Sequence, residues 1–328
     1  MINLLPDFIQ KKYEKSQVKG KFTAAVLFLD ISGFTSMTEK LMEHGKEGAE
    51  IMSLMINNIF NEMISAVYKN GGFISTFAGD AFTAIFRGKY SVNALHSANS
   101  VIQDLKDISI QKSRFGTFNI GVKIGISYGT VKWGILGDKD GSAYYFQGDP
   151  IIAAAECEKH CSAGEVIFDD SILEMYKDAI SYKKRSGKYI LTDVNAAPVV
   201  CRDSKKQIQR SIAEKFLPAE ILELNLMGEF RNAASIFLNF EMENFGFKLL
   251  NEFITFVMHI TRQTGGYLNL LDFGDKGNVI FIVFGAPVSY ENNIFRALDL
   301  VKRIGSFAEK RKGLTVRGGI SYGAVYAG

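Results

Sequence analysis

The sequence has few cysteines, little net charge and no long apolar run. Three cysteines among 328 residues are too few for a disulfide framework, which favours a reducing compartment. The formal net charge of +3 is too small to indicate a nucleic-acid or membrane-surface partner. No apolar stretch reaches the roughly 18 residues that span a bilayer, and the lysines after the first apolar patch reverse the order of a secretion signal. We therefore expect a cytoplasmic protein without a membrane span and without a nucleic-acid partner.

An internal repeat organises the chain, which is long enough for two domains of ordinary size. Three segments return later in the same order, and the last two share one offset. The repeated pairs of segments are 24–30 with 233–239, 71–72 with 265–266, and 121–129 with 315–323. We therefore predict two copies of one domain, at 1–202 and 232–328, joined by a polar, basic linker at 203–231.

The first copy predicts an α+β fold. Residues 22–29 read as a strand, and the spacing from Ser36 to Glu39 is that of a capping box. Apolar residues on one helical face then predict a helix over 49–69. The remaining expected elements are a hairpin at 73–77 and 82–86, a helix at 91–110, a strand at 122–128, a helix at 150–160 and a strand at 165–168. This β-α-β-β-α-β order is typical of a ferredoxin-like domain, with helices packed on one face of an antiparallel sheet.

Two lone carboxylates stand in apolar, strand-like surroundings. Asp30 ends the first strand just before Gly33, and Asp80 lies in the Gly-Asp turn of the hairpin. A carboxylate at such a place needs a partner or a cation. Asp30 and Asp80 together could share a pair of hard cations, beside a turn at 32–35 whose N–H groups suit an anion. Alternatively, both are ordinary turn or cap aspartates.

The two segments resemble the metal-binding segments of class III nucleotidyl cyclases. The resemblance rests on 28–35 (FLDISGFT) and 77–81 (FAGDA), while 31–40 (ISGFTSMTEK), 275–277 (DKG) and the tandem order are most similar to the soluble adenylyl cyclase branch. It implies two domains paired head to tail around one active site. It also implies conversion of ATP to 3′,5′-cyclic AMP and pyrophosphate.

The resemblance further implies the roles of individual residues. Asp30 and Asp80 would be catalytic and would bind two Mg²⁺ or Mn²⁺ ions, with the carbonyl group of Ile31 as a further ligand. The phosphates would be bound by a set of five residues. These are Ser32, Gly33, Phe34, Thr35 and Lys123. An exposed strand lysine is an equally good reading of Lys123.

The second copy departs from the family pattern. Asn239 replaces the first aspartate, so we expect no metal pair there and a single asymmetric site. Leu270 stands where the family places its adenine-reading lysine, which leaves GTP open as a substrate. Thr76 and Ile152 stand where soluble adenylyl cyclases place the basic residues that bind bicarbonate, so no response to bicarbonate is expected.

The second copy also stops early. Gly328 aligns with Gly134, before the segment that would carry the transition-state residues of the family. We therefore expect a fragment of a longer protein, with possible further C-terminal domains and poor turnover as it stands. Two alternatives remain: an inactive cyclase-like module that binds nucleotide and regulates other domains, and a ferredoxin-like nucleotide-binding module with polymerase-like metal chemistry.

Other polar residues receive ordinary interpretations. Cys157, His160 and Cys161 crowd one helical turn but lack the ligands of a zinc site. His259 falls within a helical segment without an acidic neighbour, so it receives no catalytic role. The basic cluster at 183–185 is expected to be a solvated turn.

Overall fold

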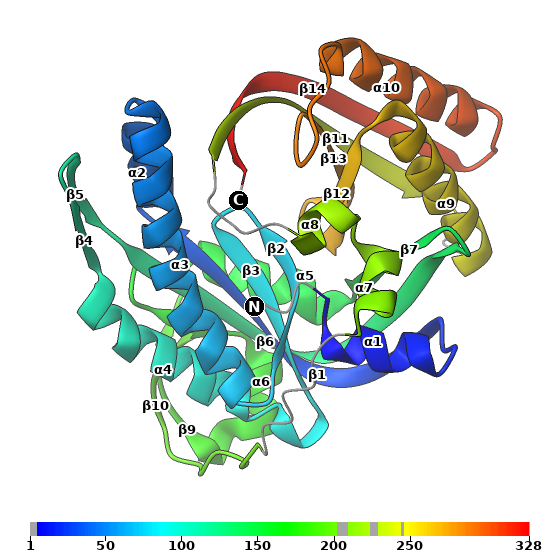
Figure 1. Cartoon of the computed structure of the whole chain (residues 1–328). Helices are drawn as coiled ribbons and strands as arrows, with labels where there is room; N and C mark the ends of the chain where they lie inside the picture. Colours follow the sequence, from blue (N-terminus) through cyan, green and yellow to red (C-terminus); the bar gives the residue numbers. More distant parts are fainter. Residues whose placement is uncertain (1–4, 202–208, 224–228, 244–245, 328) are drawn as a thin grey trace. The chain divides into compact units, whose positions relative to one another are not determined.

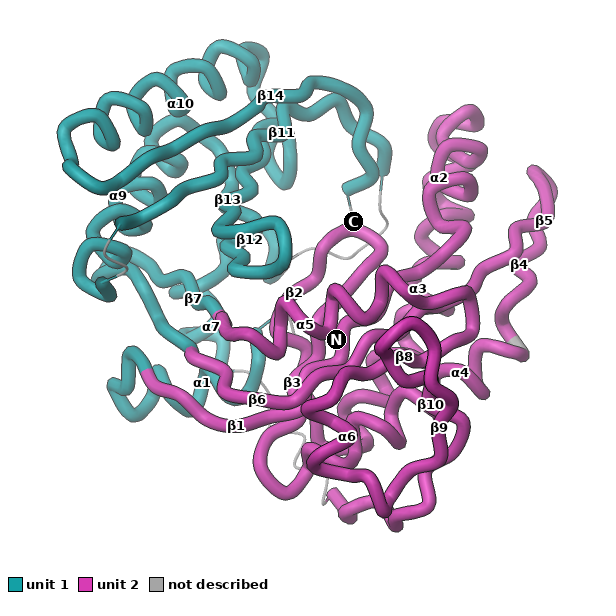
Figure 2. The backbone as a smooth tube through the Cα atoms, turned by 180° about the vertical axis from the view of Figure 1, so that it is seen from behind, with its two compact units in different colours: residues 1–19, 133–145, 207–328 teal, residues 20–132, 146–206 magenta. Residues whose placement is uncertain are grey.

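The computed structural model describes residues 5–201, 209–223, 229–243 and 246–327. Contacts divide the chain into two compact units, which are interleaved in sequence (Figure 2). We call residues 20–132 and 146–206, which are magenta and labelled unit 2 in Figure 2, the first unit, because they contain the start of the chain's first copy. Residues 1–19, 133–145 and 207–328, which are teal and labelled unit 1 there, are the second unit. Both units mix helices with sheets, as the sequence predicts. No described helix is both long enough and apolar enough to cross a membrane.

The first unit is built on a mixed sheet with the strand order β2-β3-β1-β6-β8-β10-β9, to which β7 adds by pairing with β6 (Figure 1). Most pairs are antiparallel, whereas β6 and β8 run parallel. The strands are β1 (Lys19–Ser32), β2 (Phe73–Ala78), β3 (Ala81–Arg87), β6 (Gly121–Asp138), β7 (Gly141–Gln147), β8 (Val166–Phe168), β9 (Ile180–Arg185) and β10 (Lys188–Val194). The first predicted strand and the predicted hairpin are thereby present.

Helices of the first unit follow the apolar patterns of the sequence. In α3, Met55, Ile59, Met63 and Val67 recur every fourth residue, and all four are buried. The helices are α2 (Phe34–Met42), α3 (Gly45–Lys69), α4 (Asn93–Ile108), α5 (Asp149–Lys159) and α6 (Asp170–Tyr176). The bounds of α3, α4 and α5 agree with the helices predicted at 49–69, 91–110 and 150–160 to within four residues, whereas α6 was not predicted.

The predicted capping box is wrong. Helix α2 begins at Phe34 with Gly33 as its N-cap, so Ser36 lies inside the helix and its hydroxyl donates to the Gly33 carbonyl at 3.0 Å. The glycine, with φ of 86°, makes the turn that the serine was expected to make.

Strand β6 is longer than predicted. The predicted strand ends at Tyr128, whereas β6 continues through Gly129, which packs closely against Pro150, to Asp138. Its far end and β7 form a hairpin arm. The short strands β4 (Ile110–Ser113) and β5 (Gly116–Asn119), which the sequence did not predict, form a separate hairpin.

The second unit repeats the β-α-β-β-α-β element order. Its sheet has the order β12-β13-β11-β14, which matches β2-β3-β1-β6 strand for strand. A core rich in phenylalanine, with Phe240, Phe253 and Phe284 fully buried, lies between this sheet and its helices. The elements are β11 (Glu229–Met242), α9 (Phe247–Thr264), β12 (Tyr267–Gly274), β13 (Gly277–Phe284), α10 (Asn293–Glu309) and β14 (Leu314–Ala327). The weak repeat in the sequence is therefore a repeat of topology.

Two further parts of the chain complete the second unit. Helix α1 (Asp7–Glu14) places Phe8 edge-on to Trp133, with 5.2 Å between ring centroids. The hairpin arm at 133–145 brings Tyr145 to within 4.8 Å of Phe273, centroid to centroid. The predicted linker at 203–231 lies partly outside the described residues, and its described part contains α7 (Arg210–Phe216) and α8 (Ala219–Glu223).

Candidate active site

Asp30 and Asp80 lie at the same edge of the first sheet. Strand β1 pairs with β3 in a register that sets Asp30 opposite Ala81, the neighbour of Asp80. The Ile31 N–H donates to the Asp80 carbonyl at 3.2 Å, which closes the β2–β3 turn against the end of β1. The two carboxylate-bearing residues that the sequence singled out are therefore brought together by strand pairing.

A tight turn follows Asp30. Gly33 has φ of 86°, and a Cβ atom there would lie 2.3 Å from the Asn119 carbonyl oxygen. A Cβ atom on Gly121 would likewise lie 2.6 Å from the Ser32 hydroxyl oxygen. Both glycines are thus needed for the close approach of the turn to the start of β6. Phe34 and Thr35 then open α2, so the N-terminal N–H groups of α2 begin directly after this turn.

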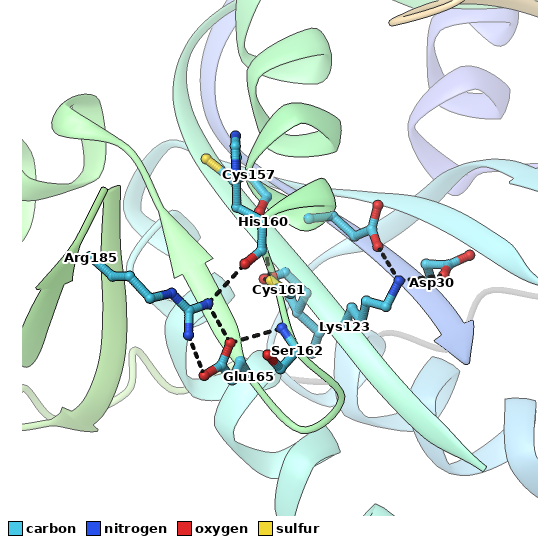
Figure 3. A network of polar contacts seen from close by, with 10 residues as sticks. Asp30, Lys123, Cys157, His160, Cys161, Ser162, Glu165 and Arg185 are labelled. Carbon is cyan, nitrogen blue, oxygen red and sulfur yellow. Dashed lines mark hydrogen bonds and ion pairs between the residues drawn. The ribbon is translucent and has the colours of Figure 1, made fainter. Parts of the chain in front are cut away.

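Lys123 reaches the site from β6. Its Nζ atom lies 3.8 Å from Oδ2 of Asp30 and 3.4 Å from Oε1 of Glu158 (Figure 3 shows Lys123 extending toward Asp30). The Lys123 side chain is 31% exposed, so it is neither a free surface lysine nor fully buried. This arrangement places a cation beside the carboxylate that the resemblance assigns to metal binding.

Glu158 is a site residue that the sequence reasoning missed. It lies on α5, its side chain is 10% exposed, and burial raises the pKa of its carboxyl group. The nearby charge of Asp30 raises that pKa further, whereas Lys123 lowers it. A signal was present: Ala154 and Glu158 are four residues apart, so a charged residue shares the small-residue face of α5.

The described residues fit a hard divalent cation. Carboxylate oxygens are the ligands that Mg²⁺ and Mn²⁺ prefer; Asp30 supplies them from β1, and Asp80 from the β2–β3 turn, next to Ala81, which pairs with Asp30. The ammonium group of Lys123 near Asp30 shows that this edge of the sheet accommodates positive charge.

In the second unit a neutral residue takes the place of Asp30, whereas the β12–β13 turn carries Asp275 and Lys276. Asn239 lies on β11 in register with Val279, and its side-chain amide donates to the Lys276 carbonyl at 3.3 Å. A neutral amide thus closes the β12–β13 turn. Leu270 is half-buried on β12, directly after a register shift between Leu268 and Leu270.

The other polar clusters differ in how well the predictions fit them. Cys157 and Cys161 are buried, and burial raises their thiol pKa values to about 12 and about 11, as suits inert packing residues. His259 lies on a helix, α9, as predicted, but the prediction that it has no acidic neighbour is wrong, because its Nε2 atom lies 2.8 Å from Oδ2 of Asp138. Sequence alone could not pair them, because the hairpin arm brings Asp138 to α9. With Asp140, these two form a group of possible metal ligands whose ligand atoms lie within 4.8 Å of one another.

The basic cluster is also more than a solvated turn. Arg185 ends β9, and its two terminal nitrogens donate to the two oxygens of Glu165 at 2.9 and 2.6 Å (Figure 3). Arg185 also donates to the His160 carbonyl at 2.8 Å. This bidentate pair fixes the β9–β10 hairpin to the segment that leads into β8.

Comparison with known sequences identifies the family. The sequence model of the adenylate and guanylate cyclase catalytic domain matches residues 16–204, which is more than half of the chain. The chain belongs to this family, and the resemblance to class III nucleotidyl cyclases is confirmed.

Individual relatives agree with this assignment. The chain is 34% identical to an adenylate cyclase of Anabaena cylindrica over 137 residues, which cover 40% of this chain and 26% of that protein. It is 23% identical to human adenylate cyclase type 10 over an alignment of 358 positions, which covers 94% of this chain and 22% of that protein. The chain thus spans about a quarter or less of the length of these two relatives. Among solved structures, the adenylyl cyclase CyaB from P. aeruginosa aligns with a TM-score of 0.44 and 24% identity, over 53% of this chain and 96% of that one.

Proposed function

We propose that the chain is a nucleotidyl cyclase that converts ATP to 3′,5′-cyclic AMP and pyrophosphate. The observation that carries the proposal is the placement of Asp30 and Asp80 at one sheet edge, beside a glycine turn and Lys123. Family membership supports the reaction class. The choice of ATP is supported by relatives that are named adenylate cyclases, while GTP stays open because Leu270 replaces the base-reading lysine.

Each residue of the site has a defined task in this proposal. Asp30, Asp80 and the Ile31 carbonyl would hold two Mg²⁺ or Mn²⁺ ions, which lower the pKa of the ribose 3′-OH and neutralise the triphosphate. The N–H groups from Ser32 to Thr35 donate to phosphate oxygens at the start of α2. Lys123 adds a positive charge on the same side.

The compartment and the domain organisation of the enzyme are part of the proposal. Cys157, Cys161 and Cys201 are free thiols, which supports a reducing, cytoplasmic compartment. Pairing of the two copies around one site, which the resemblance implies, stays a prediction. So does the prediction of further C-terminal domains.

An inactive, nucleotide-binding regulatory module is the second candidate function. Asn239 is compatible with both functions, because its amide, which donates to the Lys276 carbonyl, cannot supply the first carboxylate of a second metal pair. Leu270 favours the regulatory module, since an apolar side chain cannot donate a hydrogen bond to a base.

Product formation separates the two functions. The purified chain is incubated with Mn²⁺ and either ATP or GTP, and cyclic products are separated by chromatography. We expect cyclic AMP, and we expect Asp30→Asn and Asp80→Asn each to lower the rate by about 100-fold or more, because each removes a metal ligand.

The matched control is Asp104→Asn, which changes an exposed carboxylate on α4 and should leave the rate unchanged. If the folded wild type binds Mn²⁺ but forms neither cyclic AMP nor cyclic GMP, the cyclase proposal fails and the regulatory module takes its place.

A further inference from the structure

We propose that Glu158 is a positioning residue that retains Lys123 beside the phosphate site when a divalent cation occupies Asp30. The inference rests on the proposed function. The carboxylates of Glu158 and Asp30 share the ammonium group of Lys123. Lys123 Nζ lies 3.4 Å from Glu158 and 3.8 Å from Asp30, and Glu158 has the less exposed side chain of the two acids.

The position of Glu158 is fixed by backbone packing. Helix α5 lies directly against β6 at Gly125, where a Cβ atom would be 1.9 Å from the Ala154 carbonyl oxygen and 2.5 Å from the Glu158 nitrogen. Lys123 is two residues before Gly125, so the two residues point to the same face of β6. Glu158 and Lys123 therefore come from two elements whose backbones are in close contact at Gly125.

Charge then determines what Glu158 does. A divalent cation on Asp30 would carry the same sign as the Lys123 ammonium and would lie on the carboxylate that Lys123 faces. The cation would repel Lys123, and Glu158 offers the second carboxylate to which the ammonium moves. Without Glu158, Lys123 would pair with Asp30 and compete with the cation.

This reasoning predicts a specific pattern of Mn²⁺ affinities. Free Mn²⁺ is measured by electron paramagnetic resonance during titration of the whole chain, without nucleotide and without turnover. Glu158→Gln should weaken Mn²⁺ binding by about 10- to 100-fold, as outer-shell changes do. In a Lys123→Met background, the same change should have almost no effect, because the competing ammonium group is gone.

Two further variants make the outcomes distinct. Glu156→Gln is the matched control, since Glu156 lies on the same helix but has a side chain that is 49% exposed. Asp30→Asn tests the metal site itself. If Asp30→Asn abolishes Mn²⁺ binding but Glu158→Gln leaves it unchanged, the role of Glu158 is refuted and the cyclase proposal stands.

A loss of equal size in both backgrounds would also refute the inference, because Glu158 would then act on the cation through space and not through Lys123. If the wild-type chain binds no Mn²⁺, the metal site fails and the role of Glu158 fails with it. Circular dichroism of each variant confirms that the fold is retained.

Discussion

At the scale of single residues, the site depends on glycines as much as on carboxylates. Gly33 combines a positive φ with a backbone contact that leaves no room for a side chain. This glycine makes the tight turn between β1 and α2 that follows Asp30. A residue without any functional group therefore shapes the backbone beside the carboxylate.

Gly33→Ala should strongly destabilise the first unit. The new Cβ atom would lie 2.3 Å from the Asn119 carbonyl oxygen, and an L residue at φ of 86° is strained in addition. We expect a loss of about 3 kcal/mol or more in the free energy of unfolding, measured by urea titration.

Gly79→Ala separates strain from the clash. Gly79 has φ of 66° and no atom within 4 Å of its Cβ position. An alanine there adds backbone strain alone, so the free energy of unfolding should fall by only about 1 kcal/mol. Equal losses in both variants would show that the contact with Asn119 is unimportant.

At the scale of elements, the sequence predicted which helices and strands form better than it predicted which of them pack together. Apolar spacing predicted α3, and the Gly-Asp turn predicted the β2–β3 hairpin, because both signals are local. The pairing of Asp30 with the Asp80 turn followed from a hairpin neighbouring the first strand. The spacing of Ala154 and Glu158 marked a charge on the small-residue face of α5, but not its partner, because the contact of α5 with β6 at Gly125 joins residues far apart in the sequence.

The bidentate pair of Glu165 and Arg185 should make the stability of the first unit depend on pH. Hydrogen bonds from Arg185 lower the pKa of Glu165 in the folded chain. A lowered folded-state pKa stabilises the fold above the unfolded pKa, and this contribution is lost as pH falls through the folded value. We expect Glu165→Gln to lower the urea midpoint at pH 7, and the difference from wild type to vanish in acid.

Glu174→Gln is the matched control for this experiment, because Glu174 is exposed on the neighbouring helix α6. Its urea midpoint should follow that of the wild type at every pH. A Glu165→Gln deficit that persists unchanged in acid would contradict the ion-pair explanation.

At the scale of the whole molecule, the two copies are not separable at a single point in the sequence. The hairpin arm at 133–145 belongs by its contacts to the second unit, although it continues β6 of the first copy. Tyr145 packs on Phe273, and the Gly137 N–H donates to the Asn251 side chain at 2.9 Å. Sequence comparison of the copies could not show this, because a repeat indicates which segments are alike and not which segments are in contact.

Tyr145→Ala should therefore destabilise the second unit. Tyr145 is 7% exposed and belongs to the same buried core as Phe273, so its truncation leaves a cavity there. We expect a loss of about 3 kcal/mol, seen as faster hydrogen exchange in α9 and β12, while β3 amides serve as the internal reference.

Lys139→Ala is the control, because Lys139 is an exposed residue at the turn of the same hairpin arm. It should leave the exchange rates of α9 and β12 unchanged. If hydrogen exchange in α9 and β12 is slower or unchanged in Tyr145→Ala, the arm is not part of the core of the second unit.

The hairpin arm also has a consequence for synthesis on the ribosome. Tyr145 is translated 128 residues before Phe273, the difference between their numbers, so its docking partner does not yet exist when the arm emerges. At about 5 to 20 residues per second, the arm waits roughly 6 to 26 seconds. During that interval the side chains of Leu136 and Tyr145, which are buried in the folded chain, have no core to pack into and stay exposed on the nascent hairpin.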